Sequence, residues 1–461
     1  MTGAHWAERG GLSWPLLAWT ILVVGISVWT AASYIQHASV DVVCSDTWDY
    51  MQMIDGFLSG VFDPSEILKA HNQNRTAILV GILLTSARFD NFNQKHIEYL
   101  NLLFVSITLV NVLYLSYLLF KGRPLARGVI TLVSSIALFS LVQWENLLLS
   151  INLIFFSTVA FSVTSIVLMA LCLRGQYTQM TAAILFAVAV IMSELALFSM
   201  GGGVVVWAVN LVQIGLAIIL FQVRALTALL AYLAIAIVSV SAYLWGLEAG
   251  GSLWFLLSHP LESLAYFMIG TGNSIVGWFS NGPALWLDFL VGLFLNLVFL
   301  FVFAHFRRLP LEEQRRSLVL ISLILFGVLE QVLVTYGRLP LLGLSSAATS
   351  RYSTLTVVAP VAALIFLILH ADVSLACLRL AVVTGLVMLM FTVIGDRRQM
   401  ISAGAMHFYY SSLQQFLLDD KKIGPWEQML LGRKPLDIIQ KGNEVLRKYR
   451  LSFYRRLPVP S

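Results

Sequence analysis

The sequence predicts an all-α membrane protein, a polytopic bundle in which about eleven helices cross the bilayer. Of its 461 residues, 59% are hydrophobic and only 11% are charged, whereas an ordinary soluble domain has about 25% charged residues. A mean hydropathy of +0.83 over this length requires many segments whose solvent is lipid. No basic groove motif accompanies the net charge of +5, so attraction to anionic lipid explains that charge better than nucleic acid does.

Windows of about 20 apolar residues define the expected spans. They lie near residues 14–35, 98–120, 128–142, 148–172, 180–198, 204–221, 225–245, 284–305, 317–335, 353–371 and 374–394. The apolar stretch 76–87 is too short to cross the bilayer and suits a helix at the membrane surface.

The positions of Lys and Arg predict the orientation, because cytoplasmic loops of membrane proteins are enriched in them. With a cytoplasmic N-terminus, the outer connections 143–147, 199–203 and 246–283 contain no Lys or Arg. The inner connections contain eleven: Arg9, Lys121, Arg123, Arg127, Arg174, Arg224, Arg307, Arg308, Arg315, Arg316 and Arg379. An odd number of spans then places the tail after Ile394 outside, although that tail is basic.

We therefore expect a transmembrane domain over residues 1–395 and a periplasmic helical tail over residues 396–461. The first periplasmic loop, residues 36–97, should carry amphipathic helices on the membrane surface. This expectation rests on apolar residues that recur at helical spacing, namely Met51, Ile54, Phe57, Leu58 and Phe62.

The first polar cluster follows the first span, in DVVCSDTWDY. Asp46 and Asp49 are three residues apart, so on a helix they share one face. At the mouth of a cavity, such a pair could deprotonate a hydroxyl group or bind a cation. The alternative is a solvated loop in which an aspartate caps a helix.

The second cluster is HNQNR, which contains His71, Asn72 and Arg75. These side chains supply several hydrogen-bond donors, which suit a phosphate or a sugar. An ordinary polar start of a helix is the alternative.

The third cluster is QWEN, which contains Gln143, Glu145 and Asn146 and lies between two spans with almost no loop. Polar groups at this depth are unfavourable unless they serve a site or each other, so the pattern favours function. Glu194 and Glu330 are further acids within spans, and each could simply bond to a neighbouring helix.

The fourth cluster is YGRLPLLGLSSAATSRYST, residues 336–354, which we expect to be an outer loop. Arg338 and Arg351 flank its small residues and form a plausible clamp for a phosphate headgroup. The alternative is that both arginines extend to the membrane interface.

The motifs SDTWDY, HNQNR, QWENLLLSIN, FSMGGG and ATSRYS follow in this order over most of residues 40–355. Their order, and a first outer loop that begins with acids before a bundle with short loops, resemble the GT-C superfamily of glycosyltransferases. More narrowly, they resemble a poorly characterised group of bacterial membrane proteins. The sequence departs from that pattern at Gln73 and Asn74, where Glu and His are expected, and at Asn152, where Gln is expected. These changes could alter specificity or weaken activity.

The resemblance implies transfer of a sugar from a polyprenyl-phosphate donor to a glycan, lipid or polymer acceptor at the periplasmic face of a bacterial inner membrane. Asp46 would be the base, assisted by Asp49, while Arg75, Arg338 and Arg351 would hold the donor phosphate. The other predicted substrate-binding residues are His71, Asn72, Gln143, Glu145, Asn146 and Tyr352. The need for a divalent metal ion is left open. Expected partners are membrane lipids, the lipid-linked sugar, its acceptor and other envelope-biosynthesis proteins, with no nucleic acid.

Three alternatives remain open. The chain could be a flippase or exporter that only moves a lipid-linked glycan, an O-antigen ligase or polymerase that uses a diphosphate-linked donor, or a non-catalytic scaffold. Transporters typically spread polar groups through the midplane on broken helices. Gathering of polar clusters on one side of the membrane therefore favours an enzyme.

Overall fold

The computed structural model describes residues 14–248, 250–277, 285–419 and 434–456, and these residues form helices and connecting loops without a β-strand. Eleven helical segments among them are long and apolar enough to cross a membrane, so the predicted polytopic all-α fold is confirmed. The spans are built on α1 (Trp14–Ala38), α4 (Gln94–Leu119), α5 (Pro124–Leu138) continued by α6 (Trp144–Leu148), α7 (Leu153–Leu173), α8 (Gln179–Leu197), α9 (Val204–Phe221), α10 (Leu226–Leu244), α13 (Leu285–Phe306), α14 (Leu311–Leu342), α16 (Val358–Leu369) and α17 (Leu375–Leu418).

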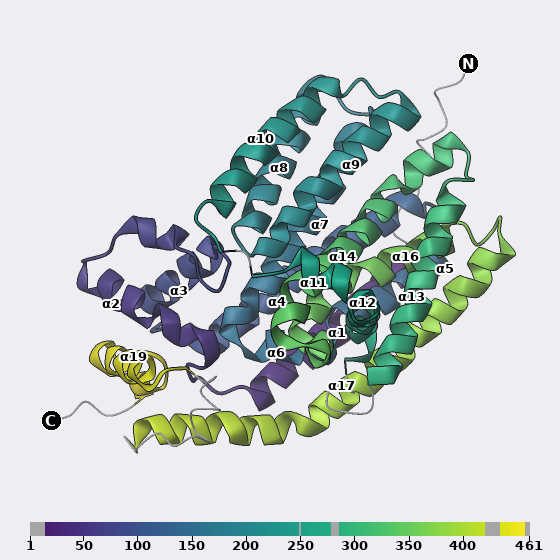
Figure 1. The fold of residues 1–461 in the computed structure, drawn as a ribbon. Helices are drawn as coiled ribbons and strands as arrows, with labels where there is room; N and C mark the ends of the chain where they lie inside the picture. Colours follow the sequence, from purple (N-terminus) through teal and green to yellow (C-terminus); the bar gives the residue numbers. More distant parts are fainter. Residues whose placement is uncertain (1–13, 249, 278–284, 420–433, 457–461) are drawn as a thin grey trace.

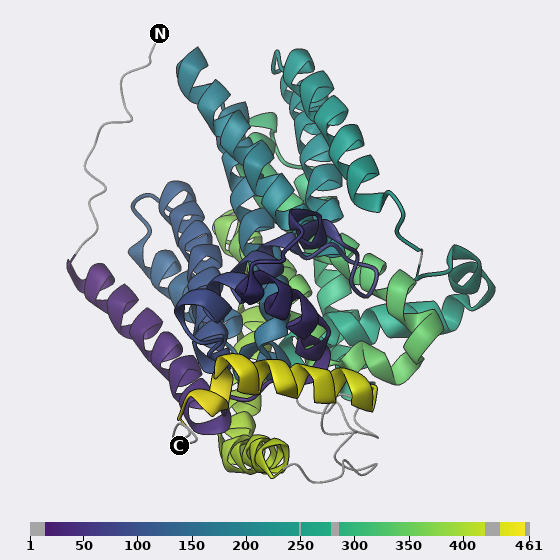
Figure 2. The same cartoon turned by 90° about the vertical axis from the view of Figure 1, so that its left-hand side faces the viewer.

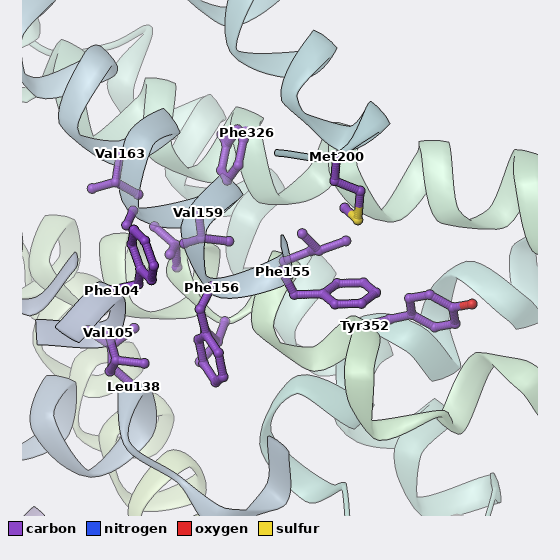
Figure 3. Packing of buried hydrophobic residues seen from close by; sticks show 14 of the residues in the cluster. Phe104, Val105, Leu138, Phe155, Phe156, Val159, Val163, Met200, Phe326 and Tyr352 are labelled. Atoms are coloured by element: carbon purple, nitrogen blue, oxygen red, sulfur yellow. The ribbon is translucent and has the colours of Figure 1, made fainter. Parts of the chain in front are cut away.

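Helix α16 lies at the centre of the bundle. The apolar window of its span is 100% buried, and α16 contacts α5, α13, α14 and α17. In contrast, α1 and α10 are only 22% and 17% buried over their windows, and the large apolar residues that they expose suit contact with lipid. The core between α4 and α7 is tightly packed, with Phe104 beside Val163 (Figure 3).

Loops that we predicted to be cytoplasmic come together at one end of the bundle. Arg123, after α4, forms an ion pair of 2.9 Å with Asp372, before α17. Arg315 of α14 donates a hydrogen bond of 2.7 Å to the carbonyl oxygen of Arg174, after α7. Because these loops contact one another, they lie on one common side of the membrane, as the predicted orientation requires. Arg9 lies outside the described residues.

The first loop forms two short α-helices, as expected, and places them at the other end of the bundle. The loop contains η1 (Ser45–Tyr50), α2 (Met51–Ser59), η2 (Pro64–Leu68) and α3 (Ala77–Phe89). Met51 and Ile54 are fully buried on one face of α2, which confirms the amphipathic pattern. Helix α3 corresponds to the short apolar stretch that we expected at the membrane surface.

The C-terminal segment returns to the first loop. It consists of α19 (Leu436–Tyr449) and η8 (Ser452–Arg456), and α19 packs against α2 and η1 (Figures 1 and 2). Lys448 pairs with Asp55 at 2.8 Å and Arg455 pairs with Asp41 at 3.0 Å. The tail and the first loop therefore lie on the same side, as an odd number of spans requires.

Three predicted boundaries differ from the structure. Helix α14 continues through Pro340 to Leu342, so the first part of the expected loop 336–354 is helical, and η6 (Leu344–Ala348) and η7 (Ser350–Tyr352) follow it. The expected outer connection 246–283 contains α11 (Leu253–Ser258) and α12 (Pro260–Val276). Finally, the expected domain boundary at residue 395 falls inside α17, which at 44 residues is about 66 Å long and extends beyond the bilayer.

Helix α12 is held by close backbone contact with α13. A Cβ atom on Gly272 would lie 1.9 Å from the carbonyl oxygen of Asp288, and one on Gly292 would lie 1.8 Å from that of Met268. Only glycine permits helices to approach so closely. The sequence analysis missed α12 because, at 17 residues, it is shorter than a typical span.

The arrangement predicts how cysteines are labelled by a membrane-impermeant thiol reagent. In a background without the three native cysteines, Val61→Cys and Lys441→Cys should react from the same side of the membrane, because the tail is docked on the first loop. Lys121→Cys should react only from the opposite side. Val61 is 83% exposed, the Lys441 side chain is 63% exposed, and Lys121 is exposed. Reaction of Val61→Cys and Lys441→Cys from opposite sides would contradict the fold.

Candidate active site

Asp46 and Asp49 lie on the short helix η1, directly after the first span. A 3₁₀-helix has three residues per turn, so residues three apart point the same way. Asp46 Oδ2 accepts a hydrogen bond of 3.0 Å from Asn72 Nδ2, and Asp49 Oδ2 lies 3.5 Å from His71 Nε2. The two first-loop motifs, predicted separately, therefore meet in one acid cluster.

The HNQN stretch is a tight hairpin turn rather than the start of a helix. His71 and Asn74 exchange two backbone hydrogen bonds, of 2.7 Å and 2.9 Å. Asn72 and Gln73 between them have positive φ angles of 44° and 66°, as a two-residue type I′ turn requires and asparagine tolerates. Asn74 Oδ1 also accepts from the backbone N–H of Gly201 at 2.8 Å, which attaches the turn to the glycine segment before α9.

Arg75 anchors this turn to the end of α10. Its Nε donates to the carbonyl oxygen of Tyr243 at 2.8 Å, and its two terminal nitrogens donate to the carbonyl oxygens of Leu68 and Trp245. All of these contacts are to backbone, and they favour a tethering role. Contact of Arg75 with a donor phosphate stays a prediction.

The QWEN and SRYST motifs interlock behind the acid cluster. Asn146 Nδ2 donates to the carbonyl oxygen of Arg351 at 2.8 Å and to Thr354 Oγ1 at 2.6 Å, and Thr354 Oγ1 donates to Gln143 Oε1 at 2.6 Å. Glu145 Oε2 accepts from the backbone N–H of Arg351 at 3.1 Å and lies 3.7 Å from its Nε. These contacts hold Arg351 in place, and of the five side chains that make them only that of Arg351 lines the adjacent cavity.

One cavity brings Asp46 of the first loop together with Arg338 and Arg351, two of the three predicted phosphate-binding arginines. Its volume is about 240 Å³, and it is open to solvent. Its polar wall consists of Asp46, Tyr50, His71, Asn72, Gln73, Asn74, Thr76, Asn152, Arg338, Arg351 and Tyr352. Asp49 lies behind this wall.

A second, more apolar cavity of about 500 Å³ adjoins the first. Six residues line both cavities, namely Gln73, Asn74, Phe155, Met200, Arg338 and Tyr352. Figure 3 shows Met200 and the rings of Phe155 and Tyr352 grouped at this shared wall, with ring centroids 6.2 Å apart. Arg338 forms no hydrogen bond or ion pair with any described residue, so its guanidinium group is available to a ligand in either cavity.

Lys434, in the C-terminal segment, is a site residue that the sequence analysis missed. Its Nζ lies 2.7 Å from Asp46 Oδ1 and 2.6 Å from Asp49 Oδ2. Burial lowers the pKa of Lys434, but the hydrogen bonds to both carboxylates outweigh burial and raise that pKa overall. Burial lowers the pKa of His71 although Asp49 and Asp46 act in the opposite direction.

A divalent metal ion, which the sequence left open, does not fit this arrangement of side chains. Oxygen-liganded cations such as Mg²⁺ need at least one or two carboxylates that are free to turn toward them. Within the described part of the chain, no group of three or more His, Cys, Asp or Glu side chains could hold a metal ion. The two candidate carboxylates already converge on the ammonium group of Lys434.

No protein-family model and no curated protein matches the chain. Among solved structures, it is similar to the archaeal oligosaccharyltransferase AglB from Archaeoglobus fulgidus in complex with an inhibitory peptide and a dolichol-phosphate. That match has a TM-score of 0.50 and 15% identity over 92% of this chain and 60% of that chain. The apo form of the Archaeoglobus fulgidus oligosaccharyltransferase matches with a TM-score of 0.48 and 13% identity over 92% and 61% of the two chains. The chain thus spans about three fifths of the length of these structures.

This likeness is one of fold. The polytopic GT-C-like helical fold that the order of motifs predicted agrees with this likeness.

The interlock between QWEN and SRYST predicts a specific loss of stability. Thr354→Val keeps the shape of the side chain but leaves Asn146 and Gln143 without their buried partner, at about 1–3 kcal/mol. Thr354→Ser retains the hydroxyl group and should lose much less. Thermal unfolding of the purified variants in detergent measures the difference. Equal melting temperatures for Thr354→Val and Thr354→Ser would show that the hydroxyl group does not hold the motifs together.

Proposed function

We propose that the chain is a membrane glycosyltransferase that moves a sugar from a polyprenyl-phosphate-linked donor to an acceptor hydroxyl group. The observation that carries the proposal is that Asp46, Arg338 and Arg351 line one cavity at the end of the bundle where the first loop lies. A carboxylate that can accept a proton and two guanidinium groups that can bind a phosphate are the two halves of this reaction.

The proposed reaction divides between the two halves. Asp46 takes the proton from the acceptor hydroxyl group while the acceptor oxygen attacks the anomeric carbon of the donor sugar. The bond between that carbon and the phosphate oxygen breaks, and the lipid phosphate leaves with both electrons of the bond. Arg338 and Arg351 stabilise the negative charge that develops on the phosphate, as fixed donors do in other sites where charge appears in the transition state.

The adjoining apolar cavity suits the lipid part of the donor. Its walls include Leu244, Leu333, Val334 and Leu355, so hydrocarbon would replace water there. Arg338 stands where the two cavities meet, which would place the phosphate between the lipid and the sugar. The dolichol-phosphate in the complex of the similar archaeal structure supports a lipid-linked donor.

We further propose that the cavity faces the periplasm of a bacterial cell and that the N-terminus is cytoplasmic. The uneven distribution of Lys and Arg supports this orientation, and the common end for first loop and tail is consistent with it. The acceptor is a glycan, a lipid or a polymer of the envelope, and the enzyme works beside other proteins of envelope biosynthesis.

The base assignment predicts a large effect of one isosteric change. Asp46→Asn keeps the shape but removes the proton acceptor, so transfer should fall by about two to four orders of magnitude. Asp49→Asn should lose less, because Asp49 lies behind the cavity wall. Asp437→Asn, which removes one carboxylate from an exposed pair on α19, is the control and should be unaffected. The readout is transfer of labelled sugar from a panel of purified polyprenyl-phosphate donors in membranes that carry each variant.

Full activity of Asp46→Asn would remove this residue from the mechanism. If no donor supports transfer by the wild type while a lipid-linked glycan crosses the membrane in its presence, the flippase alternative holds instead.

The phosphate assignment predicts a loss of donor affinity. Arg338→Gln removes charge-assisted hydrogen bonds of about 1.5–3 kcal/mol, and should therefore raise the donor KM by roughly tenfold to a hundredfold. Arg338→Lys should recover part of that loss, since it keeps the charge without the bidentate geometry. Arg88→Gln, at an exposed position of α3 in the first loop, is the control. An unchanged KM for Arg338→Gln would place the phosphate elsewhere.

A further inference from the structure

Lys434 lies between the two acids of the candidate site in a position that only a cation can favourably occupy. Its Nζ is 2.7 Å from Asp46 Oδ1 and 2.6 Å from Asp49 Oδ2, distances typical of charge-assisted hydrogen bonds. Its side chain is only 15% exposed and that of Asp49 only 19%. Little bulk water therefore screens the contact with Asp49, whereas the side chain of Asp46 is 36% exposed.

The position of Lys434 is fixed by the segment that carries it. Downstream of Lys434, Lys448 and Arg455 pair with Asp55 and Asp41 of the first loop. The backbone N–H of Ser452 donates to the carbonyl oxygen of Asn91 at 2.6 Å. Three separate attachments thus set the register of residues 434–456 on the first loop.

Close packing adds to this register. A Cβ atom on Gly442 would lie 2.6 Å from Cε3 of Trp48 and 3.0 Å from Cγ of Met51. Trp48 and Met51 flank Asp49 in the sequence, so α19 touches the same turn of chain that carries the acids. Helix α19 begins two residues after Lys434 and packs on that turn. The ammonium group of Lys434 therefore reaches the acid pair.

The alternative cation for such a pair is a divalent metal ion. It would need oxygen ligands at about 2.0–2.6 Å, and one carboxylate oxygen of each acid already contacts Lys434. A metal ion there would also meet the fixed positive charge of the lysine, which is unfavourable at this separation. The ammonium group and a metal ion therefore exclude each other.

We propose that Lys434 is the built-in cation of this site: it positions Asp46 and Asp49 and takes the place that a divalent metal ion would need, so the site works without one. The exclusion of a metal ion follows from the contacts of the acid pair alone. The claim that the enzyme is active without a metal ion rests on the proposed transferase function. In this account Lys434 is a positioning residue. Two ionised carboxylates so close together repel each other, and the ammonium group offsets that repulsion.

Removal of the lysine should turn the acid pair into a metal site. Purified full-length protein in detergent is titrated with Mn²⁺, and bound Mn²⁺ is measured by electron paramagnetic resonance. Lys434→Ala should bind about one more equivalent than the wild type, with an affinity of roughly 10⁻⁴–10⁻³ M, as for weak oxygen-ligand sites. The added binding should disappear in Lys434→Ala combined with Asp46→Asn.

Lys448→Ala is the matched control, because it removes another lysine–aspartate pair of the same segment and leaves Lys434 in place. It should bind no more Mn²⁺ than the wild type. Lys434→Met, which keeps the length and apolar stem of the side chain, replaces Lys434→Ala if that variant fails to fold. Transfer by the wild type should be unchanged by EDTA.

Two results would overturn the inference. Wild-type protein that binds Mn²⁺ in a manner abolished by Asp46→Asn would show that lysine and metal coexist. Failure of both Lys434 variants, when folded, to bind added Mn²⁺ would show that the pair is not a cation site. Absence of transfer with every donor would refute the proposed function, but it would leave the Mn²⁺ result as a separate measurement.

Discussion

A polar group that enters a bilayer is costly unless it finds a hydrogen-bond partner within the protein or reaches water, and this constraint accounts for the contacts of many polar residues in the chain. Deep in the bundle, Asn210 donates to Ser165 and to Tyr232 at 2.9 Å each, and Tyr232 bonds to Ser193 at 2.7 Å. Gln213 of α9 and Gln331 of α14 are also buried in the bundle, and their side chains form no hydrogen bond with a described residue. Most charged groups lie toward the two ends, where they link basic loops at one end and line two adjoining cavities at the other.

The candidate site depends on loops that hold each other in place. The HNQN turn bonds to the glycine segment before α9 through Asn74, and QWEN bonds to SRYST through Asn146. Each loop is short and would have no fixed position by itself, so the geometry of Asp46 and Arg351 is a property of the whole end of the bundle. This explains why residues of the predicted binding set, such as Gln143 and Asn146, act as support behind the wall.

The sequence predicted the fold and the common location of the acids and arginines, because hydropathy shows each span and the parity of spans sets the side of every loop. Lys434 could not be found in this way. Its contact with Asp49 joins positions 385 residues apart, and a lysine in a basic tail carries no local pattern that marks a partner. The tethering of Arg75 was equally hidden, since its partners are backbone carbonyl oxygens, which any sequence supplies.

The most direct test of the central claim, that one cavity joins the base to the phosphate-binding arginines, is a cryo-electron microscopy structure with a bound polyprenyl phosphate. The phosphate should lie between Arg338 and Arg351, in the cavity that Asp46 also lines. The hydrocarbon chain should lie in the adjoining apolar cavity. A headgroup bound instead at the opposite end of the bundle, in the small basic pocket lined by Arg174, Arg315 and Arg316, would contradict the account.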